Sequence, residues 1–157
     1  LLDDHIAILT LFPGMREEVM NAYLDIPNLR GLVLKTYGAG NAPKLPWLYE
    51  RLKTLSERGV VIVNTTQCAT GAVDMGRYDT SLQLIQAGVL NGHDMTLEAV
   101  VTKLMFLLGH NYDNQRICQL MNTSLVGEVT LPFAPQTDDE ACLQRGQTAK
   151  ARRVCAD

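Results

Sequence analysis

Short, nearly continuous apolar runs alternate along the chain with segments in which apolar residues recur at helical spacing. Continuous apolar runs are typical of strands that are covered on both faces, as in parallel sheets. Turn-forming residues, Pro13-Gly14 and Gly38-Ala39-Gly40, close the first two runs. We therefore expect strands over residues 5–12, 31–36, 60–64 and 89–90.

The segments with helical spacing lie between and after these strands. The clearest covers residues 96–108, with an apolar stripe made by Leu97, Val100, Val101, Leu104 and Leu108. Asp94 or Thr96 is expected to cap this helix, and Gly109 is expected to end it. Further helices are expected over residues 16–24, 47–58, 81–87 and 114–121.

Strands that alternate with helices form a parallel sheet with right-handed crossovers and helices on both faces. The expected fold class is therefore α/β, a three-layer sandwich with a mainly parallel, about four-stranded sheet flanked by helices. Ligands in such folds bind beyond the carboxyl ends of the strands. Loops at residues 12–14, 37–41 and 64–71 leave those ends, so this edge of the sheet is the expected binding site.

The loop at residues 37–41 has the composition of a binding loop. Gly38 and Gly40 permit backbone angles closed to other residues, so the main chain there can approach a ligand closely. Asn41 offers both a hydrogen-bond acceptor and a donor at the tip of the loop. The motif is too short for a dinucleotide-binding fingerprint, because no GxGxxG pattern follows.

The loop at residues 64–71 carries three threonine hydroxyls, two side-chain amides and one thiol. Two interpretations remain open: recognition of a small polar ligand such as an amino acid, or a turn whose side chains hydrogen-bond its own backbone. Thr66 and Cys68 have no base beside them in sequence, which disfavours catalysis by either residue. Lys35 lies near the carboxyl end of the second strand, where it either meets a carboxylate or extends into solvent.

Composition narrows the classes of partner. The 157 residues are 46% hydrophobic and 20% charged, as in a soluble globular domain. A net charge of -3 gives no electrostatic reason to expect nucleic acid or an anionic membrane, and no apolar run approaches the ~20 residues that span a bilayer. The four cysteines and three histidines lack metal-ligand spacing, so we expect free thiols, structural or solvated histidines, no metal and no cofactor.

The character of the chain changes near Pro132, after which it is polar, first acidic and then basic. We expect one α/β domain over residues 1–131 and a polar tail or linker over residues 132–157. The first residue is Leu1 rather than methionine, which indicates a piece of a longer protein.

Five motifs stand in the order and spacing of a known family: YGAGNAP at 37–43, VNTTQC at 63–68, MGRY at 75–78, GVL at 88–90 and HDMTLEA at 93–99. Through them, residues 6–130 resemble the C-terminal domain of cytoplasmic type I L-asparaginases. The resemblance implies a two-domain α/β enzyme that hydrolyses asparagine to aspartate and ammonia through an acyl-enzyme on a threonine. That threonine belongs to an N-terminal domain whose glycine-rich motif is absent here, so the chain alone is expected to be inactive.

The resemblance also implies where this domain acts. The active site of these enzymes forms between the N-terminal domain of one subunit and the C-terminal domain of its partner, in a homodimer or a dimer of dimers. Asn41 corresponds to the residue that reaches toward the partner's substrate, and Tyr78 is expected on the same edge. Bacterial members of the family also bind asparagine at a separate regulatory site. Thr66 and Cys68 correspond to residues that take part in that site. Lys35 stands there in place of an arginine, whose two-pronged grip on a carboxylate lysine cannot copy.

Three hypotheses follow for this chain. The first is the C-terminal domain of an L-asparaginase, in an animal-like form to judge from the mixed charge of the tail. The second is an amino-acid-sensing module that binds asparagine through Lys35, Thr66 and Cys68 without chemistry. The third is a stand-alone α/β interaction domain with no ligand.

Overall fold

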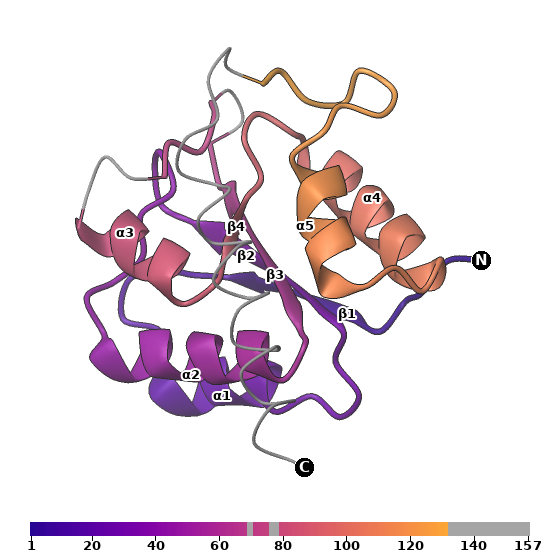
Figure 1. Ribbon diagram of the computed structural model, residues 1–157. Coiled ribbons are helices and arrows are strands. Elements are labelled where there is room, and N and C mark those ends of the chain that lie inside the picture. The colour runs from indigo at the N-terminus through magenta and orange to yellow at the C-terminus, as the bar shows by residue number, and fades with distance from the viewer. Residues whose placement is uncertain (69–70, 76–78, 132–157) are drawn as a thin grey trace.

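The computed structural model describes residues 1–68, 71–75 and 79–131. Four strands form a sheet in the order β1-β2-β3-β4, and each neighbouring pair is parallel. The strands are β1 (Ile6–Thr10), β2 (Gly31–Thr36), β3 (Val61–Thr66) and β4 (Leu90–Asn91). The helices are α1 (Glu17–Leu24), α2 (Pro46–Glu57), α3 (Asp79–Gln86), α4 (Leu97–Gly109) and α5 (Asn114–Met121). Helices cover both faces of the sheet (Figure 1), which confirms the predicted three-layer α/β sandwich.

The predicted elements all occur, with shifted ends at several of them. Strand β1 ends at Thr10, two residues before the predicted end. Strand β3 continues to Thr66, because its parallel pairing with β2 keeps polar residues in the hydrogen-bonded ladder. Helix α3 begins at Asp79, two residues earlier than predicted.

The prediction that Gly109 ends α4 is confirmed. Gly109 is the last helical residue, and the left-handed backbone conformation comes later, at Asn111 with φ 54°. A side chain at position 109 would run into the carbonyl of Leu1, because the start of the chain passes directly over it. This close approach accounts for the glycine. Of the two predicted caps, Thr96 holds the N-terminus of α4 by accepting a hydrogen bond from Ala99 N at 3.2 Å.

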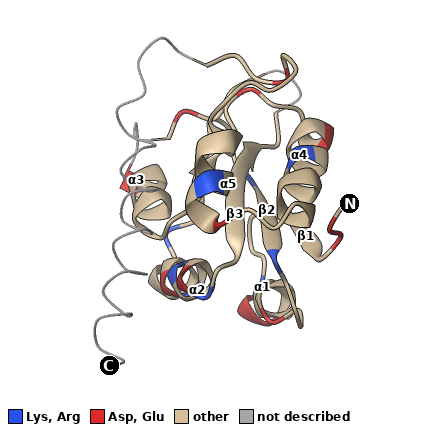
Figure 2. Ribbon diagram, turned by 45° about the vertical axis from the view of Figure 1, so that its right-hand side comes forward, with Lys and Arg blue, Asp and Glu red and all other residues tan. Residues whose placement is uncertain are grey.

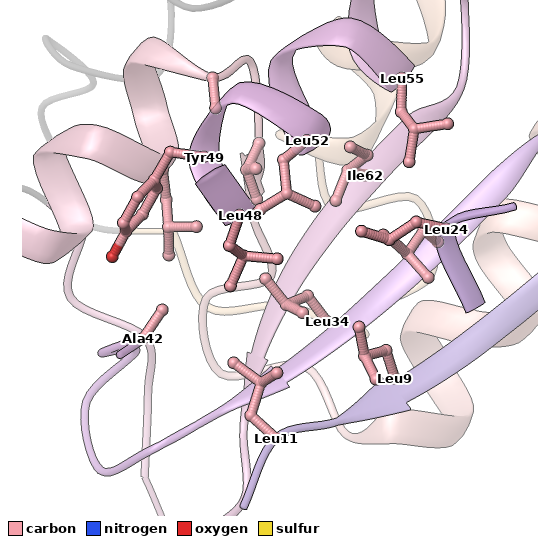
Figure 3. Close-up of a cluster of buried hydrophobic side chains, with 14 of the residues drawn as sticks. Leu9, Leu11, Leu24, Leu34, Ala42, Leu48, Tyr49, Leu52, Leu55 and Ile62 are labelled. Atoms are coloured by element: carbon pink, nitrogen blue, oxygen red, sulfur yellow. The ribbon is translucent and has the colours of Figure 1, made fainter. Parts of the chain in front are cut away.

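The sheet separates two hydrophobic clusters. The cluster under α1, α2 and α3 includes Leu9, Leu34, Leu48, Leu52 and Ile62, whose side chains interdigitate between β1–β3 and α2 (Figure 3). The cluster under α4 and α5 includes Val33, Val63, Leu104, Leu107 and Ile117. Each fully buried side chain of this size contributes about 1.5–3 kcal/mol relative to an exposed one.

Charged residues lie on the helices and on the connecting segments, while the strands carry few of them (Figure 2). In the part of the chain that the structure describes, no helix has the length and hydropathy needed to cross a lipid bilayer.

One charged residue departs from the predicted pattern of α4. Lys103 is buried, whereas Leu97 and Val101 of the predicted stripe are only partly buried. The Lys103 ammonium pairs with Glu128 at 2.6 Å and also donates to the carbonyl oxygens of Met121 and Thr123. This contact ties the segment after α5 to the middle of α4.

Candidate functional site

The loop at residues 37–41 lies at the carboxyl end of β2 and is held by its neighbours at three successive carbonyl groups. Thr66 donates its hydroxyl to Gly38 O. The backbone N–H of Asp74 donates to Ala39 O at 2.9 Å. Asn64 donates its side-chain amide to Gly40 O at 3.1 Å. Hydrogen bonds to all three carbonyl groups restrain the backbone of this loop.

Behind this loop lies a buried polar network. Asn64 is 0% exposed, and its Oδ1 atom accepts a hydrogen bond of 2.7 Å from the hydroxyl of Thr36, also 0% exposed. The two residues lie on neighbouring strands and bond side chain to side chain across the sheet. Because Asn64 uses both ends of its amide, it links β2 to the loop that follows β2 without leaving a buried polar atom unpaired.

The three predicted loops do emerge on one edge of the sheet. Gln67 demonstrates this, because its Nε2 atom donates to Leu11 O at 2.6 Å and to Lys35 O at 3.0 Å. One side chain after β3 therefore reaches the ends of both β1 and β2. The edge predicted from strand order is confirmed, since β1, β2 and β3 are adjacent and parallel.

Most of the described polar side chains at the end of β3 and just after it are structural. Asn64, Thr66 and Gln67 all donate to main-chain carbonyls of neighbouring loops. Of the two interpretations left open for residues 64–71, backbone hydrogen bonding therefore describes these three side chains. The buried hydroxyl of Thr65, between Asn64 and Thr66 in the sequence, has no hydrogen-bond partner.

Asn41 stands at the end of the fixed loop with its carboxamide partly exposed. Its backbone exchanges hydrogen bonds with Tyr37 at 2.8 and 2.9 Å, which closes the loop. Its side-chain Oδ1 accepts from the hydroxyl of Thr80, in the first turn of α3, at 3.2 Å. Sequence spacing gave no indication of this last contact.

Two tyrosines border the loop. Burial raises the pKa of the Tyr37 phenol, and burial likewise raises the pKa of Tyr49. Both are therefore neutral at physiological pH. The Tyr49 hydroxyl donates to Pro43 O at 3.1 Å and so fixes the chain just beyond Asn41.

The residues predicted for a regulatory site are only partly brought together. Cys68 is exposed, its backbone N–H donates to Thr66 Oγ1 at 3.0 Å, and its sulfur lies 3.9 Å from Gly38 O. Lys35 pairs in register with Thr65, one residue before Thr66. Because successive side chains of a strand alternate between faces, Lys35 projects from the α4 face and Thr66 from the opposite face. Tyr78, predicted on the same edge, lies outside the described residues.

The histidines and cysteines that the structure describes have structural surroundings. His93 Nε2 lies 3.1 Å from Asn122 Oδ1, and His110 Nδ1 lies 2.7 Å from Phe106 O. Cys68 and Cys118 are both thiols, as predicted. Cys142 and Cys155 lie outside the described residues, as does the tail predicted over residues 132–157.

One group of potential metal ligands occurs in the described part of the chain, at Asp3, Asp4 and His5. Asp3 accepts a hydrogen bond from the backbone N–H of His5 and pairs with Arg30, and these contacts lower its pKa. The group lies at the start of β1, opposite the loop edge, and we assign it no metal.

Comparisons with known proteins agree with this architecture. A family model described as the glutaminase/asparaginase C-terminal domain matches residues 5–121. L-asparaginase 1 of Escherichia coli is 42% identical over 125 residues, which are 80% of this chain and 37% of that protein. The 60 kDa lysophospholipase of Homo sapiens is 38% identical over 134 residues, 83% of this chain and 23% of that protein. The crystal structure of L-asparaginase I from Vibrio cholerae superposes with a TM-score of 0.76 at 44% identity, covering 81% of this chain and 38% of the other. The chain thus spans well under half the length of each of these relatives.

Proposed function

Because the chain belongs to the glutaminase/asparaginase C-terminal domain family, we propose that it is the C-terminal domain of a cytoplasmic L-asparaginase, which converts asparagine to aspartate and ammonia. In this proposal the nucleophilic threonine lies in an N-terminal domain outside these 157 residues. The present domain supports dimerisation and supplies Asn41 to the active site of the partner subunit. The chain alone is then inactive.

The observation that carries this proposal is the way in which Asn41 is presented. It stands on the sheet edge, on a loop whose carbonyl groups are each held by β3 or by the segment after it. A contact made by a loop that is already ordered has no ordering cost when substrate binds. Rigid presentation of one polar side chain suits a domain that completes a site whose reacting groups belong to another domain.

Two finer assignments accompany the proposal. Tyr78 is a second substrate contact on the same edge, of lesser weight than Asn41. The animal-like form of the enzyme is supported by the charged tail and by the similarity to the human relative.

The test uses the full-length protein that contains this chain. Loss of a hydrogen bond to a charged group costs about 1.5–3 kcal/mol, so Asn41→Ala should lower kcat/KM for asparagine roughly 10- to 100-fold. Gln115→Ala is the matched control, because it removes an exposed carboxamide from α5, away from the loop edge. Equal kcat/KM values for the two variants would show that Asn41 does not contribute to the active site.

A second candidate function is an amino-acid-sensing site that uses Lys35, Thr66 and Cys68. The contact of Thr66 and Cys68 with one another and with Gly38 favours it, while the projection of Lys35 from the other face of the sheet weighs against it. Calorimetric titration of the full-length protein, with its nucleophile disabled, separates the two functions. Two asparagine-binding events per subunit support sensing, and a single event supports the active site alone.

A further inference from the structure

The contact between Thr80 and Asn41 joins two parts of the chain that are 39 residues apart. Thr80 is only 8% exposed and belongs to the first turn of α3, a helix anchored in the core by Leu84, which is 0% exposed. A hydroxyl on such a rigid element has little freedom to follow a moving partner. The hydrogen bond therefore restrains Asn41 rather than Thr80.

This hydrogen bond occupies one end of the Asn41 carboxamide and leaves the other end without a bonded partner among the described residues. Thr80 Oγ1 donates to Oδ1 at 3.2 Å, so the oxygen end of the amide is occupied. Among the described residues, no acceptor is bonded to the Nδ2 end of Asn41. A carboxamide has two N–H donors at that end. In this arrangement the NH₂ group is the end of the side chain left to meet a ligand.

The backbone of Asn41 is already fixed by its two hydrogen bonds to Tyr37, and Gly40 before it is held by Asn64. The remaining freedom of Asn41 is rotation about its side-chain bonds. Thr80 is the described residue whose side chain opposes that rotation.

We infer that Thr80 is a positioning residue that holds the Asn41 carboxamide in place through a hydrogen bond to one end of it, so that the other end is presented to the ligand. This inference rests on the proposed role of Asn41 at the partner's active site and adds the residue that orients it. Thr80 itself touches no substrate. Its effect on catalysis passes entirely through Asn41.

A first test needs no enzymatic activity. In the nitrogen-15-labelled chain, the order parameter of the Asn41 side-chain amide reports the amplitude of its motion on the ps–ns timescale. Thr80→Val removes the hydroxyl while keeping the shape, and it should lower this order parameter. Thr80→Ser keeps a hydroxyl at the same position and should restore it. An order parameter that is the same in the wild type and Thr80→Val contradicts the inference.

A second test uses kinetics of the full-length protein. Loss of one neutral hydrogen bond corresponds to roughly a three- to tenfold effect, so Thr80→Val should raise KM for asparagine by about that factor with a smaller change in kcat. Thr80→Ser should stay within about twofold of wild type. In an Asn41→Ala background, Thr80→Val should have no further effect, because a residue that acts through Asn41 has nothing left to position.

The outcomes distinguish this inference from the proposed function. A loss of activity in Thr80→Val that persists undiminished in the Asn41→Ala background indicates a general structural role and overturns the inference. Normal kinetics of Thr80→Val together with impaired Asn41→Ala also overturns it, while the proposed function stands. Unchanged kinetics of Asn41→Ala overturns the proposed function instead, and the order parameter then decides the positioning role by itself.

Discussion

The pair of Lys103 and Glu128 is the most buried ion pair in the described part of the chain, with side chains 4% and 10% exposed. The ammonium group has three acceptors: Glu128 Oε1 at 2.6 Å, Thr123 O at 2.6 Å and Met121 O at 3.4 Å. Burial of a charge is costly unless such partners are complete. We therefore predict that neutralising Glu128 destabilises the domain substantially.

The magnitude follows from the titration of the carboxyl group. Burial alone would raise the pKa of Glu128, but hydrogen bonds from Lys103 and from the backbone N–H groups of Val126 and Leu125 outweigh it and lower the pKa from 4.5 to about 2. Because each pKa unit corresponds to about 1.4 kcal/mol, the ionised carboxylate contributes about 3 kcal/mol to the free energy of unfolding. Domains of this size have only about 5–15 kcal/mol in total.

The pH dependence has a defined sign. The folded-state pKa lies below the unfolded value, so the contribution is fully present above pH 4.5 and is lost as the pH falls through about 2. Glu128→Gln mimics the protonated form. The stability difference between wild type and Glu128→Gln should therefore be about 3 kcal/mol at pH 7 and should shrink toward zero near pH 2.

Urea unfolding measures this difference through the fluorescence of Trp47, the single tryptophan, which packs in the other hydrophobic cluster and so reports global unfolding. Glu57→Gln, at an exposed position of α2, is the control and should change stability by less than about 0.5 kcal/mol. A Glu128→Gln variant as stable as this control at pH 7, or a difference that does not depend on pH, would refute the reasoning.

Two further predictions concern the site edge. Thr65→Val should stabilise the domain by about 1 kcal/mol, because it replaces a buried hydroxyl that has no hydrogen-bond partner. Thr36→Val should instead destabilise the domain by about 1–3 kcal/mol, because it leaves Asn64 Oδ1 unpaired. Urea unfolding of the two variants checks these opposite signs, and equal effects on stability would contradict them. Gly40→Ala should destabilise the domain more than Gly38→Ala. Both glycines have a positive φ, but a Cβ at position 40 would also lie 2.7 Å from the side chain of Val73. Thermal unfolding ranks the stability of the two variants, and the reverse order would be inconsistent with this packing.

Much of the architecture could be predicted from the sequence. Continuous apolar runs identified the strands, and strand order placed the loops after β1, β2 and β3 on one edge, as Gln67 now demonstrates. Periodicity was sufficient for β2 and β3 because both faces of these two strands are buried. It failed at Lys103, since a lysine in a helical pattern indicates a solvent-facing position and its partner Glu128 lies 25 residues away.

The site was harder to predict because it depends on pairs of distant residues. The contact of Thr80 with Asn41 joins residues 39 positions apart and depends on where α3 places its first turn. The placement of Lys35 relative to Thr66 depends on the register of β2 and β3, in which a shift of one residue reverses the face of every side chain. Sequence spacing alone contains no information about that register.

The central claim is that this domain completes an active site in a partner subunit, and subunit mixing tests it most directly. Full-length subunits with Asn41→Ala are mixed, after dissociation and reassembly, with full-length subunits whose nucleophilic threonine is disabled. Each parent has low activity, but a mixed dimer contains one site in which both contributions are intact. If Asn41 acts across the interface, an equal mixture should recover about a quarter of wild-type activity. No recovery above the two parents would contradict the account.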